Sequence, residues 1–215
     1  MNVPEPTIYV VDDDVAVREA LSSLLRANGL RVVTFGSAGD FLSAGAHQAL
    51  GEGIGCLVLD VQLPDIDGVE LQQRLSQTRM PISIVFLTGY GDIPMTVRAI
   101  KAGAVGFLTK PIDEDQLLPA ILEAIEESRK SYEERASLLE LKARFDSLTP
   151  REQQVLRRVV AGRLNKQIAG EIGTTETTVK LHRGNMMRKL GIRSVAELVL
   201  AVQRIDGSST YTKVE

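Results

Sequence analysis

The sequence has almost no cysteine and no long apolar run. Its one cysteine, Cys56, has no second thiol in the chain, so an internal disulfide is excluded. Cys56 lies inside an apolar segment, which favours a buried small hydrophobic side chain over a redox group. No apolar segment reaches the roughly 18 residues that a membrane span requires, and residues 1–6 lack the basic and then apolar pattern of a signal peptide. These absences predict a cytoplasmic protein that does not enter a membrane.

The net charge of −3 conceals two halves of opposite sign. Residues 1–130 carry 10 basic and 18 acidic side chains, whereas residues 131–215 carry 15 basic and 10 acidic ones. An acidic segment followed by a basic one predicts two modules with different partners. A basic module is a candidate for binding nucleic acid, although this charge alone is weak support.

The first half alternates short β-branched or apolar runs with helical patterns. The expected strands are residues 7–11, 31–35, 56–60, 82–88 and 104–109. Helical patterns separate them, with Asp14 and Ser37 as N-caps. Residues 44–55 are expected to form a loop that leaves His47 in solvent. Strands that alternate with helices predict an α/β domain with a five-stranded, doubly wound parallel sheet of the flavodoxin-like kind.

Polar residues follow these expected strands at the ends where a parallel sheet gathers them. Asp12 and Asp13 follow the first strand, Asp60 ends the third, Thr88 ends the fourth and Lys110 follows the fifth. Each alone is explained as a loop residue or a helix cap. Because ligands bind at the carboxyl ends of the strands in such sheets, the whole set points to a binding site.

Clustered carboxylates at that edge have a chemical use. Three such groups raise one another's pKa unless a cation lies among them, and Mg²⁺ prefers oxygen ligands and works beside phosphate. Asp13 would hold Mg²⁺ directly and Asp12 through water, leaving Asp60 ionised as a nucleophile toward phosphorus. Lys110 and Thr88 would bind the phosphoryl oxygens as charge develops. The pattern therefore predicts an aspartyl phosphate at Asp60.

Residues 7–125 resemble the receiver domain of two-component response regulators. The matching segments are Val10-Val11-Asp12-Asp13, Leu57-Val58-Leu59-Asp60, Leu63-Pro64-x-x-x-Gly68, Phe86-Leu87-Thr88-Gly89 and Phe107-Leu108-Thr109-Lys110-Pro111. The resemblance implies that Asp60 accepts a phosphoryl group from a phosphohistidine on a sensor histidine kinase. It also implies that Mg²⁺ is bound by Asp13, Asp60 and the backbone carbonyl of Gln62, and that the Lys110–Pro111 peptide is cis.

The same resemblance implies a readout of the phosphate. The Thr88 hydroxyl would move toward the phosphoryl group, Phe107 would turn inward, and the face formed by residues 93–109 would favour a homodimer. An ordinary half-buried strand residue is the alternative for Phe107. The stretch Asp92-Ile93-Pro94-Met95-Thr96-Val97 resembles the FixJ/StyR branch of the family in particular.

A long helical pattern joins the two modules. Residues 126–146 are rich in charged residues, leucine and alanine, which predicts a helical linker, with a flexible coil as the alternative. Pro119 lies close upstream, where it would remove a helical hydrogen bond. Either the regular helix begins near Pro119 or the proline kinks it. The apolar residues hold no clean heptad, so a strong coiled coil is not supported.

Residues 147–207 contain the start and stop signals of four short helices. Thr149-Pro150-Arg151-Glu152 is a capping box, and Asn165, Thr175 and Ser194 are expected to cap the next three helices. Gly173 would form the turn of a helix-turn-helix. The third helix carries five basic or histidine side chains and one acid, as a major-groove reader does, although a solvated charged face is the alternative.

Residues 148–200 resemble the LuxR/NarL-type DNA-binding domain. The matching segments are Leu148-Thr149-x-Arg151-Glu152, Gly162-x-x-Asn165-Lys166-x-Ile168-Ala169 and Glu176-x-Thr178-Val179-Lys180-x-His182-x-x-Asn185-x-x-x-Lys189-Leu190-Gly191. By resemblance, the base edges are faced by Lys180, Leu181 and Gly184, and the phosphates by Lys166, Thr178, His182 and Arg183. The fourth helix would pair two domains across a DNA dyad. Gly184 departs from the larger polar residues of the family and removes a possible base contact.

The predicted domains are a receiver (1–125), a helical linker (126–146), a helix-turn-helix domain (147–207) and a polar tail (208–215). The predicted function is a transcription factor in which phosphorylation promotes dimerisation and DNA binding. It is not an enzyme beyond slow Mg²⁺-dependent self-dephosphorylation. Expected partners are a sensor histidine kinase, double-stranded DNA and a second copy, with RNA polymerase as a further candidate. Two alternatives remain: a regulator that binds DNA constitutively, and a phosphatase of the haloacid dehalogenase type, which places its nucleophile after the first strand.

Overall fold

The computed structural model describes residues 4–78, 81–89 and 93–207. Contacts divide the chain into two units, residues 1–133 and 134–215. The predicted polar tail lies outside the described residues, as does Asp92 of the stretch that resembles the FixJ/StyR branch. No helix in the described part of the chain is both long and apolar enough to cross a membrane.

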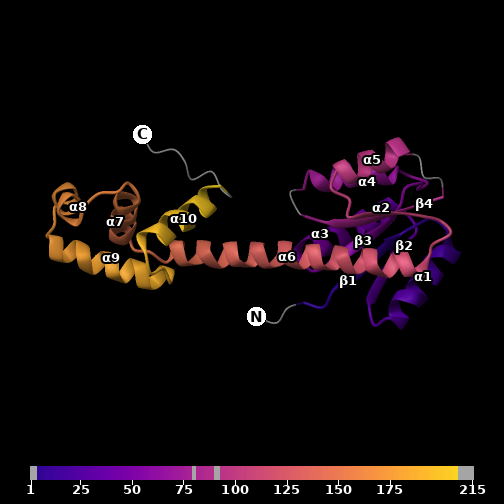
Figure 1. Ribbon diagram of the computed structural model, residues 1–215, viewed down its shortest axis with the longest axis horizontal. Coiled ribbons are helices and arrows are strands. Elements are labelled where there is room, and N and C mark those ends of the chain that lie inside the picture. The colour runs from indigo at the N-terminus through magenta and orange to yellow at the C-terminus, as the bar shows by residue number, and fades with distance from the viewer. Residues whose placement is uncertain (1–3, 79–80, 90–92, 208–215) are drawn as a thin grey trace. The chain divides into compact units, whose positions relative to one another are not determined.

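The first unit is built on a five-stranded parallel sheet with the order β2-β1-β3-β4-β5 (Figure 1). The strands are β1 (Thr7–Val11), β2 (Arg31–Phe35), β3 (Gly55–Asp60), β4 (Ser83–Thr88) and β5 (Gly106–Thr109). All residues of β3 and β4 are buried, as their continuous apolar sequences predict. This strand order is that of the flavodoxin-like fold, so the fold predicted for this unit is confirmed.

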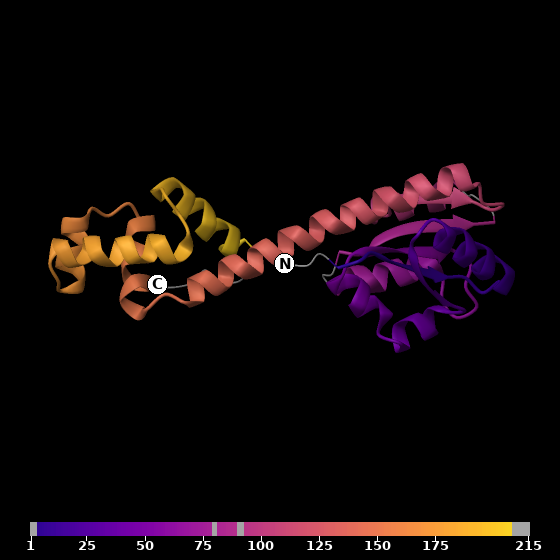
Figure 2. The same ribbon diagram turned by 90° about the horizontal axis from the view of Figure 1, so that it is seen from below.

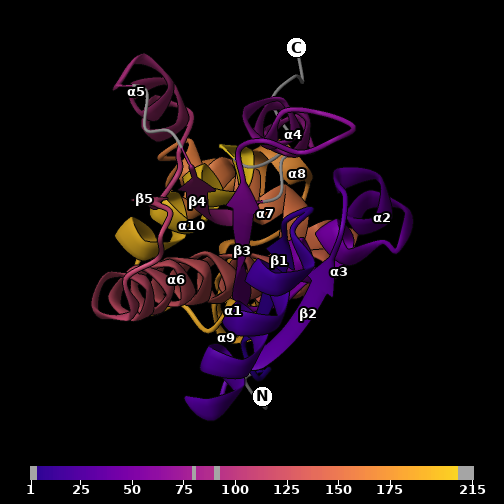
Figure 3. The same ribbon diagram turned by 90° about the vertical axis from the view of Figure 1, so that its right-hand side faces the viewer.

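Helices cover both faces of the sheet, as the end-on view in Figure 3 shows. On one face α1 (Val15–Ala27) and α6 (Glu114–Asp146) pack on side chains such as Ile8, Val58 and Val85. On the other face lie α2 (Ala38–Ser43), α3 (Ala46–Glu52), α4 (Gly68–Ser76) and α5 (Ile93–Lys101). Cys56 is fully buried, and burial raises the pKa of its thiol to about 12. The thiolate is therefore not formed at neutral pH, which agrees with a packing role.

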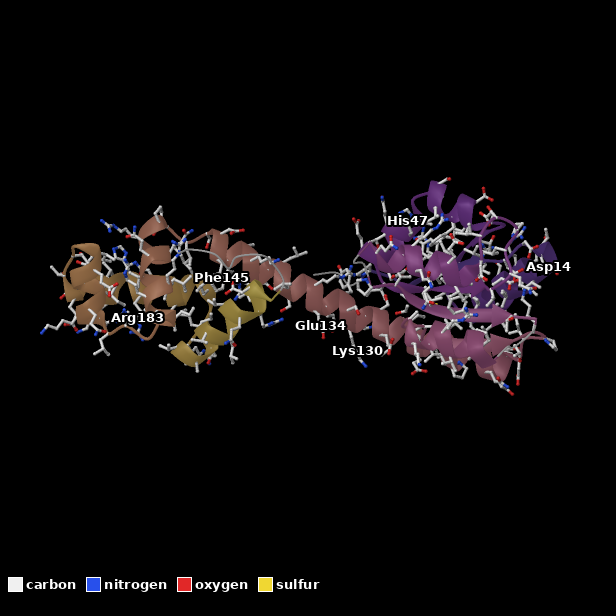
Figure 4. The ribbon with its side chains drawn as sticks, turned by 90° about the horizontal axis from the view of Figure 1, so that it is seen from above. Asp14, His47, Lys130, Glu134, Phe145 and Arg183 are labelled. Atoms are coloured by element: carbon white, nitrogen blue, oxygen red, sulfur yellow. The ribbon has the colours of Figure 1, made fainter. Side chains whose placement is uncertain are left out.

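The loop predicted for residues 44–55 is wrong, because residues 46–52 form α3. Gly45 precedes this helix in the left-handed conformation, with a φ of 66°. His47, labelled in Figure 4, is half-buried, its ring centroid lies 6.3 Å from that of Phe41, and its Nδ1 atom is buried. It is therefore not a solvated loop residue. The gain from packing a short amphipathic turn on the sheet outweighed the low helix propensity of this glycine-containing segment.

Helix α6 runs without interruption from Glu114 to Asp146 and includes Pro119 (Figure 2). Of the two alternatives for Pro119, a regular helix that begins near it is wrong, because α6 already begins at Glu114, and the coil alternative for residues 126–146 is also wrong. Leu117 and Ile121, on either side of the proline, are fully buried against the sheet, and this burial offsets the hydrogen bond that proline cannot make. The buried Ser128 hydroxyl accepts a hydrogen bond from the Gly55 amide at 3.0 Å, which fixes this part of the helix to the start of β3.

The second unit contains α7 (Pro150–Val160), α8 (Asn165–Ile172), α9 (Glu176–Leu190) and α10 (Val195–Asp206). Its core includes Val155, Ile168 and Met186, and the last residues of α6 pack on it through Phe145. The predicted caps Thr149, Thr175 and Ser194 are confirmed. Gly173 closes α8 in the left-handed conformation, with a φ of 67°, as a tight turn before α9 requires.

The N-cap predicted at Asn165 is wrong. Leu164 takes the N-cap position, Asn165 is the first helical residue, and the Leu164 amide donates to Gln167 Oε1 at 2.9 Å. The Asn165 side chain instead accepts a hydrogen bond from Arg183 Nη1 on α9 at 3.1 Å. The Asn165 side chain therefore bonds to a residue of another helix, and not to the backbone of its own helix as its sequence position predicted.

Candidate functional site

The sheet register brings two carboxylates together at the carboxyl edge. Val11 at the end of β1 pairs with Leu59 of β3, so Asp12 and Asp60 follow side by side. This is the point where the strand order reverses, and it is where open α/β sheets bind their ligands. Asp12 is fully buried and Asp60 is 5% exposed, whereas Asp13 faces solvent. Two neighbouring strands thus supply the acidic groups.

Lys110 joins the two buried carboxylates. Its Nζ atom lies 2.6 Å from Asp12 Oδ2 and 2.6 Å from Asp60 Oδ2. Lys110 reaches them from the end of β5, where its backbone amide donates to the Thr88 carbonyl at 2.7 Å. The Lys110–Pro111 peptide is cis, as predicted. The cation is therefore placed by the sheet and by the loop that leaves it.

Burial and charge act against each other in this group. Burial raises the pKa of the Asp12 carboxyl, and the hydrogen bond from Lys110 offsets only part of the rise. Burial also works against the charged form of Lys110, but its hydrogen bonds to Asp12 and Asp60 outweigh burial, and the pKa of its ammonium is raised. Lys110 is therefore charged at neutral pH and balances part of the negative charge around it.

The acidic residues also fit a divalent cation. Asp12, Asp13 and Asp60 each offer an oxygen, and these ligand atoms lie within 4.8 Å of one another. It is the only group of this kind in the described segments of the chain. An all-oxygen donor set suits Mg²⁺, which commonly binds through one or two carboxylates and keeps several waters. The site can therefore hold a metal beside a carboxylate that Lys110 also contacts.

The other predicted residues of this edge surround Asp60. The Gln62 amide donates to Asp60 Oδ1 at 3.1 Å, so the loop after β3 turns back onto the carboxylate. Thr88 is 1% exposed at the end of the neighbouring strand β4. Phe107 lies on β5, half-buried, with its ring centroid 6.1 Å from that of Phe86. The structure therefore gathers the predicted receiver residues around one edge, except for Phe107, which lies two residues before the end of β5.

Two polar side chains near this edge were not predicted. Arg18 Nη1 on α1 donates to the backbone carbonyl of Asp12 at 2.6 Å. Asp65, in the loop after β3, accepts hydrogen bonds from the amides of Ala38 and Gly39 at 3.3 and 2.6 Å. Nothing in the sequence distinguishes these two residues from other charged residues. Their contacts join segments that only the fold brings together.

In the second unit, α9 presents a mixed face to solvent. Lys180, Leu181 and Gly184 are all exposed and share one side of the helix through their spacing of three and four residues. The Leu181 side chain is 61% exposed. That opposite side, which includes Val179 and Met186, is buried in the domain core. These three residues are thus accessible to a partner, although Lys180 Nζ also lies 3.1 Å from Glu176 Oε1.

The residues predicted to lie near phosphates are divided between α8 and α9. Lys166 is exposed in the first turn of α8, and His182 is half-buried on α9. Thr178 is close to the start of α9, where its hydroxyl lies 2.9 Å from that of Thr175. Arg183, labelled in Figure 4, binds Asn165 and so connects α9 to the start of α8. A basic helix after a tight turn, supported by a second helix, is the arrangement of a helix-turn-helix.

Comparison with known families agrees with both halves of this description. Residues 8–122 match the response regulator receiver domain, and residues 146–202 match the bacterial regulatory proteins of the luxR family. The chain belongs to the response regulators that carry a LuxR-type DNA-binding domain. A receiver domain implies a sensor kinase as partner, and a LuxR-type domain implies DNA. The family is not enzymatic, which excludes the haloacid dehalogenase alternative.

Relatives match this chain over nearly their whole length. This chain is 48% identical over 208 residues to the response regulator protein TmoT of Ectopseudomonas mendocina. The match covers 97% of this chain and 93% of the relative. The chain is 40% identical over 197 residues to the transcriptional regulatory protein FixJ of Bradyrhizobium diazoefficiens, covering 92% and 94%. A solved structure of the response regulator StyR has 49% identity and a TM-score of 0.80, covering 94% of this chain and all of that one.

Proposed function

We propose that this response regulator is a transcription factor switched by phosphorylation of Asp60. The observation that carries the proposal is the contact of Lys110 with both Asp12 and Asp60 at the carboxyl edge of the sheet. Asp60 Oδ2 is paired with this cation, and its other oxygen accepts the Gln62 amide. The nucleophile is thereby held in one orientation.

The chemical step is a transfer between two nucleophiles. An oxygen of Asp60 forms a bond to phosphorus while the bond from phosphorus to the imidazole nitrogen of a phosphohistidine breaks, and the imidazole leaves with the electron pair. Lys110 and the Thr88 hydroxyl stabilise the charge that develops on the phosphoryl oxygens. Asp13, Asp60 and the Gln62 carbonyl would hold Mg²⁺, and Asp12 would assist through water. When bound, Mg²⁺ neutralises negative charge on the carboxylates and the phosphoryl group.

The phosphoryl group is read out by a shift between two arrangements of the receiver. Thr88 turns toward the phosphate, Phe107 moves inward, and the face of residues 93–109 favours a homodimer. The dimer brings two copies of α9 to one DNA site, and α10 pairs the two domains. Linking two binding modules raises the effective concentration of the second one without a new DNA contact. Lys180, Leu181 and Gly184 face the base edges, and the residues near phosphates are Lys166, Thr178, His182 and Arg183.

DNA binding and oligomeric state, measured with and without phosphoramidate plus Mg²⁺, test this function. We expect dimerisation and DNA affinity to rise together in the unmodified chain. Asp60→Asn should block both, because an amide is a poor nucleophile and forms no acyl phosphate here. Full phosphoryl transfer to Asp60→Asn would contradict the site assignment. Tight DNA binding that phosphoramidate does not change would instead favour the constitutive regulator.

A further inference from the structure

One carboxylate fastens the loop after β3 to a distant helix. This loop, residues 61–67, leads from Asp60 to α4. Asp65 Oδ2 accepts a hydrogen bond from the Gly39 amide at 2.6 Å, and Asp65 Oδ1 accepts one from the Ala38 amide at 3.3 Å. These two amides belong to the first turn of α2. The Ser37 hydroxyl caps the same turn through the Asp40 amide at 3.0 Å, so Asp65 supplies acceptors that the local cap does not.

The helix that receives Asp65 is firmly held. Its Phe41 is fully buried, with ring centroids 6.0 Å from Tyr9 on β1 and 5.6 Å from Phe35 on β2. Edge-to-face contacts of this kind add to the free energy gained by burying the ring. The hydrogen bonds that Asp65 accepts from α2 therefore connect the loop to a helix that is packed on the sheet.

The position of this loop matters for the metal site. Asp60 is the last residue of β3, and Asp12 and Asp13 directly follow β1, where the Asp12 amide donates to the Phe35 carbonyl at 3.2 Å. The Gln62 carbonyl alone among the proposed ligands is placed by the loop. The loop also turns closely against β3, because a Cβ on Gly68 would lie 2.4 Å from the Asp60 carbonyl oxygen. Gln62 therefore lies between the end of β3, which the sheet fixes, and Asp65, which is bound to α2, and the loop returns to β3 at Gly68.

We propose that Asp65 is a positioning residue that holds the Gln62 carbonyl in place to bind Mg²⁺. The inference rests on the proposed function, and it adds a residue that touches neither the metal nor the phosphoryl group. Its contribution is to remove the freedom that the loop would otherwise lose when the metal binds. Residues that orient metal ligands in this way typically change metal affinity by about 10-fold or more when they are replaced.

Asp65→Ala removes both acceptors and should weaken Mg²⁺ binding by roughly 10-fold. Asp65→Asn keeps one acceptor oxygen for the Gly39 amide and should give an intermediate affinity. Asp67→Ala is the matched control, because the Asp67 carboxylate lies in the same loop and caps only its own helix, through the Val69 amide at 2.7 Å. It removes the same charge close to the same site but does not break the connection to α2.

Isothermal titration calorimetry of the full chain with MgCl₂ gives the affinity, and thermal unfolding in EDTA gives the stability of each variant. We expect Asp65→Ala to bind Mg²⁺ more weakly than the unmodified chain, and Asp67→Ala to bind it with an affinity within about 2-fold of that chain. This difference should remain when the two variants unfold at similar temperatures. Hydrogen exchange at the Gln62 and Leu63 amides should be faster in Asp65→Ala alone. If Asp65→Ala does not fold, Asp65→Asn with the same control decides the question.

Equal Mg²⁺ affinity in the unmodified chain and Asp65→Ala would overturn the inference and leave the proposed function standing. An equal loss in Asp65→Ala and Asp67→Ala would overturn it as well, because the effect would then belong to the loop or its charge and not to the contact with α2. An unmodified chain that binds no Mg²⁺ would contradict the proposed metal site itself, and this inference with it.

Discussion

Lys189 Nζ lies 2.7 Å from Glu152 Oε2 and so joins the last turn of α9 to the first turn of α7. The same carboxylate oxygen accepts the Thr149 amide at 2.8 Å, closing the capping box of α7. The Glu152 side chain is only 5% exposed, whereas that of Lys189 is 38% exposed. A buried carboxylate on α7 is thus paired with a lysine on the helix that is proposed to read DNA.

Replacing Glu152 with Gln should lower the free energy of unfolding of the second unit by about 2 kcal/mol, because hydrogen bonds to a buried charged group are lost or weakened. Hydrogen exchange of the α7 and α9 amides measures this free energy without a contribution from the receiver. Glu176→Gln is the control, since the Glu176–Lys180 pair is exposed and should contribute no more than about 0.5 kcal/mol. Equal effects of the two substitutions would show that burial of Glu152 does not matter.

Acid should destabilise the second unit through the same carboxyl. Burial alone would raise the pKa of Glu152, but the hydrogen bonds from Lys189 and Thr149 outweigh burial, and its pKa lies below the ordinary value of 4.5. A pKa that is lower in the folded state stabilises the fold above the unfolded-state pKa, and this contribution is lost as the pH falls through the folded-state value. Below about pH 4.5, the unmodified unit should therefore lose stability faster than Glu152→Gln. Parallel pH curves for the two proteins would contradict this prediction.

Asp13→Asn should act in opposite directions on stability and on metal binding. Asp13 is exposed beside the buried Asp12 and Asp60, so removing its charge relieves repulsion worth up to about 1 kcal/mol when no metal is present. Urea unfolding in EDTA should show higher stability for the variant, and calorimetry with MgCl₂ should show weaker binding. Asp14→Asn is the control, because Asp14 caps α1 and lies outside this group, and an asparagine caps as well. A similar change in both variants would sink the explanation.

Gly184→Ala should stabilise the protein and impair DNA recognition. Gly184 lies inside α9, and a Cβ there would meet no protein atom within 4 Å, so alanine should add about 1 kcal/mol of stability. The added methyl group would lie on the face that carries Lys180 and Leu181, where base edges approach. Binding to duplexes selected from a random pool by the unmodified protein should weaken. Gly170→Ala on α8 is the control, because it also has open space and should stabilise without changing the selected sequence.

Ser128→Ala should loosen the attachment of α6 to the receiver sheet. It leaves the Gly55 amide without its acceptor in a buried position, which costs about 1–3 kcal/mol. Thermal unfolding monitored by exchange of the β3 amides checks this value. Ser137→Ala in the same helix is the control, because Ser137 is exposed and belongs to the second unit. No destabilisation by Ser128→Ala would show that water replaces the hydroxyl.

The sequence by itself determined the order of the elements and the chemistry at their ends. Continuous apolar runs such as Cys56–Leu59 predicted buried parallel strands, and a parallel sheet brings the ends of its strands to one edge. Asp12, Asp60 and Lys110 were therefore predicted to meet although they are far apart in the chain. N-caps such as Thr149 and Thr175 were also predicted correctly, because the side chain of an N-cap bonds to a backbone amide only two or three residues away.

The tertiary structure alone decided the features that depend on contacts between distant segments. Residues 46–52 form a helix because they pack on the sheet. Pro119 lies inside a helix because the residues on either side of it are buried. The contacts of Asp65 with α2 and of Glu152 with Lys189 join residues that are far apart in the sequence, so no local sequence pattern predicts them. Local propensities amount to a few tenths of a kcal/mol per residue, whereas burial of one large side chain amounts to about 2 kcal/mol, so packing wins where the two disagree.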